Sequence, residues 1–168
     1  MPLREILLLG NPQLRVKSTE VKQFNDEYEA NLEDLKDTLL YLQKTRKIGR
    51  AIAAPQIGWR KNVIVFNLPD RSFVMVNPKI LSKSREIIEV WDSCFCFDIA
   101  FFIKIERFKE IKVKYLNKEG TTKVETFGDD FSELIQHEID HLNGILATDH
   151  LKNPKQIVMR HEWEQRFK

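Results

Sequence analysis

The spacing of apolar positions near the start of the chain predicts one long helix. In residues 24–46, apolar side chains recur every three or four positions, which is the spacing of one helical face. Asn25 or Asp26 can cap the start of this helix, and Gly49 follows its basic end as a stop. The apolar positions are Phe24, Tyr28, Leu32, Leu35, Leu39 and Leu42.

The middle of the chain has the pattern of a β-rich region. Its short runs of β-branched and aromatic residues are typical of strands. Residues 117–120 have the composition of a hairpin turn. The strands that we expect cover residues 62–66, 72–76, 87–91, 99–105, 111–115 and 121–127.

The pattern becomes helical again near the C-terminal end. Asp129 or Asp130 can cap a helix running through residues 132–143, and a last helical piece is predicted after Pro154. A helix, then strands, then a helix predict an α+β fold. We expect mostly antiparallel strands packed around a central helix that carries a His-Glu-x-x-His motif, in a single domain spanning residues 1–168.

Composition narrows the class of protein. Of 168 residues, 42% are hydrophobic and 31% are charged, as in an ordinary soluble globular domain. The net charge is only +2 and no compact basic block stands out, so nucleic-acid binding has no support. The apolar run at residues 6–9 is too short for a signal peptide, and no stretch approaches the ~20 apolar residues of a membrane span. We therefore expect a cytoplasmic monomer without a membrane partner.

The two cysteines indicate metal or redox chemistry. Cys94 and Cys96 are separated by a single residue, a spacing at which a disulfide would be strained. Two neighbouring thiols in a cytoplasmic protein favour a metal site or a redox role over a structural bridge.

The strongest chemical signal is the motif formed by His137, Glu138 and His141. Two histidines at positions i and i+4 of a helix project from one face, close enough to bind one divalent metal. The glutamate between them can take a proton from a metal-bound water. Two chance histidines on a surface helix are the alternative.

A catalytic site of this kind needs a third protein ligand. Cys94, upstream, is a soft ligand suited to zinc or ferrous iron. A metalloprotease would instead take its third ligand downstream of the motif. The downstream candidates are His150, His161, Asp149 and Glu162.

Three motifs in the same order resemble those of the peptide deformylase family. Residues 49–56 (Gly-Arg-Ala-Ile-Ala-Ala-Pro-Gln) are similar to its first motif, and residues 92–96 (Asp-Ser-Cys-Phe-Cys) take the place of its second. Residues 136–144 (Gln-His-Glu-Ile-Asp-His-Leu-Asn-Gly) match its third closely. The segment at residues 6–15 is also similar, so the resemblance covers nearly the whole chain.

The resemblance implies a metal centre. Cys94, His137 and His141 would hold one divalent metal ion. In this family the ion is typically Fe²⁺, and Zn²⁺ or Ni²⁺ can replace it. Asp140 would have a supporting role at most.

The resemblance also implies a reaction, the removal of formate from the N-terminal formyl-methionine of new polypeptides. Glu138 would act as general base and then as the acid that protonates the departing amine. Gln56 and the backbone N–H of Phe95 would donate hydrogen bonds to the oxyanion. The partner would be a formylated peptide or the N-terminus of a nascent chain, and the ribosome is implied by the family role alone.

Departures from the family motifs cluster near the expected substrate groove. Ala51 stands where the family has a glycine whose backbone pairs with the peptide, and Arg50 fills a position that is usually small and aliphatic. We expect Gly49, Arg50, Ala51 and Ser93 to contact substrate, with Ser93 narrowing the pocket. Arg50 could equally face solvent. Cys96 replaces a serine and is either a small buried residue or a redox-sensitive neighbour of Cys94.

The helix before the third motif departs as well. Glu133 lies four residues before His137, on the same helical face, and the resemblance places Asp130, Glu133 and Leu134 along the pocket for the methionine side chain. Two acids there would oppose methionine, because burying an unpaired carboxylate is costly. Alternatively, Asp130 is the N-cap and Glu133 its capping-box partner.

Four hypotheses follow from these observations. The first is a deformylase acting on formyl-methionyl peptides, and the second is a related amidase acting on a different formylated or acylated amine. The third is a non-catalytic metal-binding scaffold of the same fold. The fourth is a metalloprotease that uses His150 or His161 as third ligand.

Overall fold

The strands form two sheets that curve around one helix. The computed structural model describes residues 4–168, so the first three residues of the predicted domain lie outside it. All neighbouring strands within the two sheets are antiparallel. One sheet has the order β1 (Ala51–Ala53), β2 (Val63–Asn67), β3 (Ser72–Lys83), β6 (Glu110–Leu116), β7 (Thr122–Gly128). The other has the order β4 (Ile87–Asp92), β5 (Phe101–Phe108), β8 (Ile157–Met159).

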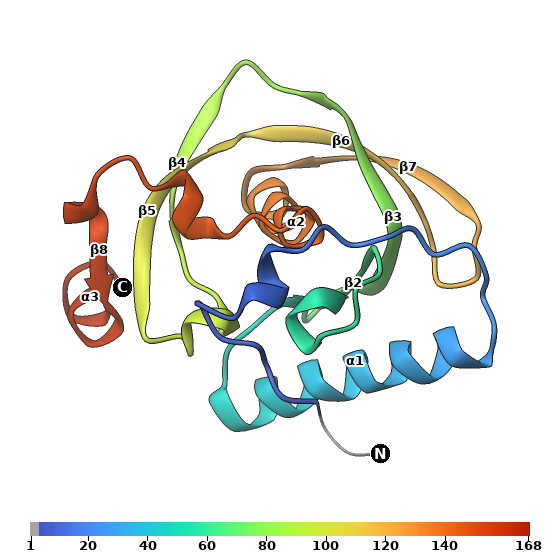
Figure 1. Cartoon of the computed structure of the whole chain (residues 1–168). Helices are drawn as coiled ribbons and strands as arrows, with labels where there is room; N and C mark the ends of the chain where they lie inside the picture. Colours follow the sequence, from blue (N-terminus) through green and yellow to red (C-terminus); the bar gives the residue numbers. More distant parts are fainter. Residues whose placement is uncertain (1–3) are drawn as a thin grey trace.

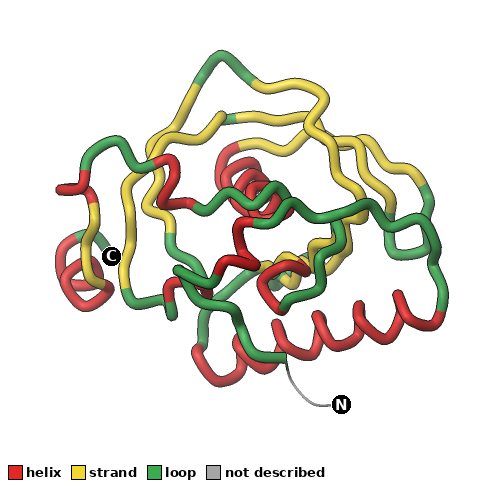
Figure 2. Tube along the Cα trace, viewed as in Figure 1, coloured by secondary structure: helices red, strands yellow, loops and turns green. Residues whose placement is uncertain are grey.

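Three α-helices complete the described part of the chain: α1 (Asp26–Arg46), α2 (Asp129–Leu142) and α3 (Arg160–Arg166). Figure 1 shows α2 in the middle of the molecule, α1 along one side and the short α3 beside β5. Figure 2 shows the same arrangement, with the helices in red and the strands around α2 in yellow. This arrangement confirms the predicted α+β class with antiparallel strands around the helix that carries the histidines.

Helix α1 forms because its sequence supplies both a cap and an apolar face. The Asn25 side chain accepts a hydrogen bond from the backbone N–H of Tyr28 at 3.0 Å, which satisfies one of the free donors of the first turn. Leu32, Leu35 and Leu39 are completely buried and pack into a core shared with β2. The predicted helix is confirmed, and it begins at Asp26.

Helix α2 is buried along almost its whole length. Ile135, Ile139 and Leu142 pack against the five-stranded sheet. The Gln136 side chain donates to the backbone oxygen of Phe108 at 2.9 Å and accepts from its N–H at 3.1 Å, which ties the helix to the end of β5. A helix enclosed in this way can hold polar side chains at fixed positions inside the molecule.

Several predicted boundaries were wrong for local reasons. The N-cap of α2 is Gly128, and Asp129 and Asp130 are already helical, so neither is the cap. Strand β5 begins later than predicted because Asp98 and Ile99 adopt positive φ angles of 48° and 56°. The chain from Pro154 is only partly helical, since a short 3₁₀ turn, η5 (Pro154–Gln156), leads into β8 along β5 before α3 begins.

Candidate metal centre and active site

Three separate segments supply the predicted catalytic residues. Gln56 lies on a short 3₁₀ turn, η2 (Ala54–Ile57), directly after β1. Cys94 follows β4 and caps a second 3₁₀ turn, η3 (Phe95–Phe97). The histidines and Glu138 come from α2. All of these side chains are buried, so the site lies at the junction of both sheets and the central helix.

The sulfur of Cys94 is in contact with one of the two histidines. Its Sγ lies 3.3 Å from Nε2 of His141. Ligand atoms of Cys94, Cys96 and His141 all lie within 4.8 Å of one another, which makes these three residues a possible metal-binding group. The neighbouring Cys96 therefore joins the candidate ligands, although sequence analysis treated it as a buried small residue or a redox-sensitive neighbour. Both cysteines are free thiols, as expected.

His137 is not a member of that group of three, but it lies beside it. Its ring centroid is 5.0 Å from that of His141, with the two rings nearly perpendicular. Its Nδ1 lies 2.9 Å from Oδ2 of Asp92, so Nε2 is the nitrogen left for a ligand. The Asp92 carboxylate outweighs the effect of burial and raises the pKa of His137 to about 9. In the same pair, His137 and Arg107 overcome burial and lower the pKa of Asp92 to about 2.

A buried ion-pair network supports this side of the site. Arg107, on β5, donates to Oδ2 of Asp92 at 3.2 Å and to Oδ2 of Asp140 at 2.5 Å. Asp140 also lies 2.7 Å from Nε2 of His150. The Arg107 side chain is only 3% exposed, so its ion pairs lie in the interior of the protein.

The two downstream histidines lie outside the candidate ligand group. His150 contacts Asp140 in the ion-pair network, and His161 is exposed, with its Nε2 3.0 Å from the amide of Gln165. Neither downstream histidine belongs to the group around Cys94.

Among the predicted ligands and catalytic residues, two side-chain polar atoms have no hydrogen-bond partner within residues 4–168. They are Oε2 of Glu138 and Nδ1 of His141, both fully shielded from solvent. Burial, offset in part by the charge of His137, raises the pKa of Glu138 to about 7. Burial and the charge of His137 lower the pKa of His141 to about 3, so its ring is neutral and able to bind a metal.

The amide of Gln56 is held in one orientation. Its Oε1 accepts the backbone N–H of Ala53 at 2.8 Å, so Nε2 must face the other way. Nε2 lies 3.5 Å from Sγ of Cys94 and 3.4 Å from Sγ of Cys96. Because Nε2 carries two hydrogens, it can donate to a sulfur and to a second acceptor at once.

The backbone of η3 offers a second donor. The N–H groups of Phe97 and Asp98 make the hydrogen bonds of this turn, so the turn itself leaves the N–H of Phe95 free. The Phe95 ring packs on Gly49, where φ is 105° and an added Cβ would lie 2.2 Å from the ring. Gly49 thus permits the close approach that seats Phe95.

A cavity of about 350 Å³ opens onto this centre. Gly49, Arg50, Ala51, Ser93, Glu133 and Leu134, predicted to bind substrate, all line it. Ser93 donates its hydroxyl to the backbone oxygen of Phe101 at 2.8 Å. The C-terminal segment, which sequence analysis did not connect with the site, supplies Arg160, Trp163, Glu164 and Lys168.

Trp163 is fixed in that wall by aromatic packing. Its ring stacks on Phe102 with centroids 4.1 Å apart, and Arg160 lies over the same phenylalanine. No motif in the sequence linked the C-terminal segment to the rest of the site. The pairing of β8 with β5 brings it there, together with hydrogen bonds from Arg160 to the backbone oxygens of Ile99 and Ala100.

Arg50 is ion-paired with two acids of α2. Its guanidinium donates to Oδ2 of Asp130 at 2.5 Å and to Oε2 of Glu133 at 3.1 Å. Arg50 is therefore ion-paired although its side chain is 37% exposed. The capping box was a wrong interpretation, because Gly128 is the N-cap of α2. Asp130 itself is exposed and does not line the cavity.

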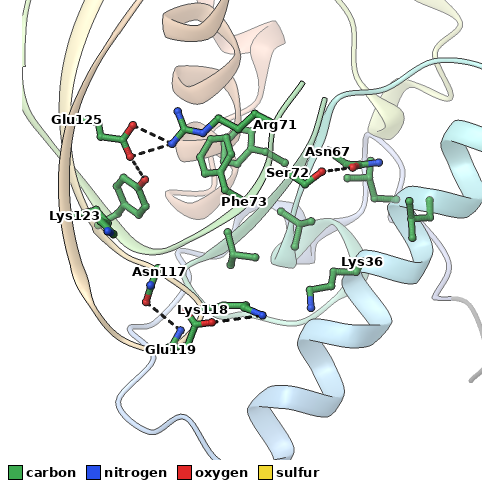
Figure 3. A pocket seen from close by; sticks show the side chains of 16 residues that line it. Lys36, Asn67, Arg71, Ser72, Phe73, Asn117, Lys118, Glu119, Lys123 and Glu125 are labelled. Atoms are coloured by element: carbon green, nitrogen blue, oxygen red, sulfur yellow. Dashed lines mark hydrogen bonds and ion pairs between the residues drawn. The ribbon is translucent and has the colours of Figure 1, made fainter. Parts of the chain in front are cut away.

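A larger cavity, of about 540 Å³, lies elsewhere, between α1 and the five-stranded sheet (Figure 3). Its wall carries an ion pair between Arg71 and Glu125, and Arg71 lies over the Phe73 ring at 4.2 Å. Tyr115 donates its hydroxyl to the same glutamate. This cavity contains no histidine or cysteine, so the smaller one holds the candidate chemistry.

Comparison with known proteins identifies the family. The family model described as polypeptide deformylase matches residues 3–157. The chain belongs to this family. It is 35% identical over 154 residues to the peptide deformylase of Heliobacterium modesticaldum, covering 91% of this chain and 97% of that protein. It is 32% identical over 155 residues to that of Thermotoga petrophila, covering 92% and 91%.

Solved deformylase structures have the same fold. The crystal structure of the peptide deformylase from Thermotoga maritima superimposes with a TM-score of 0.83 at 30% identity, covering 91% of this chain and 100% of that one. The Met-Ala-Ser-bound peptide deformylase from Acinetobacter baumannii gives a TM-score of 0.79 at 28% identity, covering 89% and 99%. The chain is therefore a deformylase-type hydrolase that removes the formyl group from nascent polypeptides.

Within residues 4–168, no helix has the length and apolar character to cross a membrane.

Proposed function

We propose that this deformylase hydrolyses the formyl amide with a divalent metal held by Cys94, His137 and His141. The observation that carries the proposal is the 3.3 Å contact between Cys94 and His141 at the base of an open cavity, beside the unpartnered carboxylate oxygen of Glu138. A thiolate and two imidazoles are borderline-soft ligands that suit Fe²⁺, with Zn²⁺ or Ni²⁺ as substitutes.

The residues around the centre fit a metal. His141 is neutral, and a metal at Nε2 of His137 would replace the proton that the Asp92 contact otherwise holds on that ring. Cys94 is buried, which raises the pKa of its thiol unless a cation balances the thiolate. When bound, the metal would polarise the formyl carbonyl and make a water more acidic.

Glu138 is the proposed proton carrier. Its buried Oε2 has no hydrogen-bond partner among residues 4–168, and its pKa of about 7 suits a group that takes and returns a proton near neutral pH. It would accept the proton of the attacking water and then deliver it to the nitrogen of the departing amine.

Two N–H donors would stabilise the oxyanion that forms on the formyl oxygen. One is Nε2 of Gln56, oriented by Ala53, and the other is the free backbone N–H of Phe95. Both are fixed before substrate arrives, so neither has to reorganise during the reaction.

The peptide itself would lie along the edge of β1. Among the described strands, β1 pairs only with β2, so its other edge is available to an extended chain. Ala51, on that strand, lines the cavity. We propose that formylated N-termini of new polypeptides, as they leave the ribosome, bind here to a cytoplasmic monomer made of one domain.

The test is formate release from formyl-Met-Ala-Ser by protein loaded anaerobically with Fe²⁺. We expect turnover that Glu138→Ala removes while bound iron, measured by elemental analysis, stays at one per chain. Stoichiometric iron without formate release from any formyl peptide would overturn the catalytic proposal and favour the non-catalytic scaffold.

A further inference from the structure

The charged residues Arg50 and Glu133 form part of the wall of the catalytic cavity. Glu133 lies on α2, one helical turn before His137, and Arg50 lies directly before β1. Their ion pair, with a distance of 3.1 Å between Arg50 and Oε2 of Glu133, joins the start of β1 to α2, although the two residues are 83 positions apart in the sequence. The Glu133 side chain is only 9% exposed, so this carboxylate belongs to the interior of the site.

The pair leaves one acceptor unused. Oε2 of Glu133 accepts from Arg50, whereas Oε1 has no hydrogen bond from residues 4–168 and is not sealed from the cavity. Asp130 accepts from the same guanidinium, so two carboxyl groups share one arginine. A ligand in this part of the cavity therefore meets a carboxylate oxygen that lacks a donor.

Apolar contacts adjoin this acceptor. Leu134 and Ile48 line the same cavity, and Ala51 adds a methyl group on the β1 side. A side chain with an aliphatic stem and a donor at its tip would match both features. A thioether would instead cover the free acceptor without donating to it, which leaves a buried polar group unsatisfied.

We infer that Glu133 selects substrates whose formylated residue has a hydrogen-bond donor at the end of its side chain, of the amide or amine type, over methionine. The inference rests on the proposed function, because it assigns a side chain to the same site. Arg50 holds Glu133 in place as a positioning residue, and Glu133 makes the contact.

The experiment compares kcat/KM for formyl-Gln-Ala-Ser and formyl-Met-Ala-Ser, whose first side chains are similar in length, with formyl-Lys-Ala-Ser as a cationic probe. We expect the glutamine and lysine peptides to be preferred by about tenfold, the usual effect of one hydrogen bond to a charged group. The gain should appear mainly in KM, because the contact is remote from the reacting atoms.

The matched variant replaces the buried pair by apolar residues of similar size, Arg50→Met with Glu133→Leu. Such replacements often keep a protein folded, whereas removing one partner alone leaves a buried charge. We expect the preference to reverse towards formyl-methionine in this variant. Formyl-methionine preferred in the wild-type protein, and equally in the variant, would overturn the inference and leave the proposed function standing. No formate from any peptide would overturn both.

Discussion

The Nδ1 atom of His137 lies 2.9 Å from Oδ2 of Asp92, and this one contact decides which ring nitrogen is available to a metal. Arg107 holds the same carboxylate at 3.2 Å from the other side. A carboxylate that accepts from an imidazole fixes its tautomer and strengthens it as a ligand. The buried network around Arg107 is therefore part of the candidate metal centre.

Asp92→Asn should weaken metal binding. Loss of a carboxylate behind a ligating histidine typically costs roughly 10–100-fold in affinity, and competition with a chromophoric chelator would measure it. Asp98→Asn is the matched control, because Asp98 forms an exposed ion pair with Arg46. Equal affinity in Asp92→Asn and wild-type protein would contradict a ligand role for His137.

The two cysteines should differ in their effect on metal content. We expect Cys94→Ser to lose the bound metal and Cys96→Ser to retain it, because the proposed ligands are Cys94 and the two histidines. Elemental analysis gives the stoichiometry, and the sulfur-to-metal absorption of the Co²⁺-loaded protein reports the number of thiolates. Reduced absorption in Cys96→Ser would instead make Cys96 a ligand, as its proximity to Cys94 and His141 allows.

Glu138→Gln should reduce kcat by roughly 10²–10⁴-fold, the usual contribution of a general acid–base group. Metal content and KM should change little, because the substitution keeps the size of the side chain. Steady-state kinetics with elemental analysis of the same sample tests this. Activity that survives at the wild-type level would assign the proton transfer to another group.

Gly49→Ala should destabilise the fold and displace Phe95. Gly49 and Gly10 both have positive φ, at 105° and 103°, but only at Gly49 would the new methyl meet a side chain. Gly10→Ala thus measures the backbone strain alone, of about 1–3 kcal/mol, and the excess in Gly49→Ala measures the contact. Urea unfolding of both variants gives the difference, and similar losses would show that Phe95 moves aside freely.

The ion pair in Figure 3 should affect stability in acid. Although burial opposes it, hydrogen bonds from Tyr115 and Arg71 lower the pKa of Glu125 below its ordinary value. A lowered carboxyl pKa gives stability that is present above the unfolded-state pKa and is lost as pH falls through the folded-state pKa. Glu125→Gln should therefore reduce the melting temperature at pH 7 and leave it nearly unchanged at the acid end. A reduction equal at both pH values would contradict this.

The features that the sequence predicted correctly are those set by residues close together in the chain. Helix α1 and its Asn25 cap follow from neighbours within four positions, and so does the placement of the histidines on α2. The missed features depend on distant partners. Nothing near Arg50 in the sequence indicates that it pairs with Glu133, and the approach of Trp163 depends on β8 adding to β5.

The turn at η3 shows a second limit of sequence patterns. Residues 99–105 are apolar enough to be read as one strand, but Asp98 and Ile99 adopt left-handed conformations that end η3 before β5 begins. Within η3, the backbone N–H of Cys96 donates to Sγ of Cys94 at 3.3 Å, so the two cysteines stay together although the segment is not extended. Periodicity does not report such backbone angles.

The shortness of β1 has a consequence for the behaviour of the protein in solution. A site that receives a peptide by strand addition needs an unpaired sheet edge, and such edges also invite other chains to join and aggregate. Because β1 has only three residues, its backbone hydrogen bonds alone are too few to bind a second copy of the protein. In the proposed binding mode, a peptide anchored by its formyl group at the metal centre would not depend on these backbone hydrogen bonds, so the edge could accept substrate while resisting self-association.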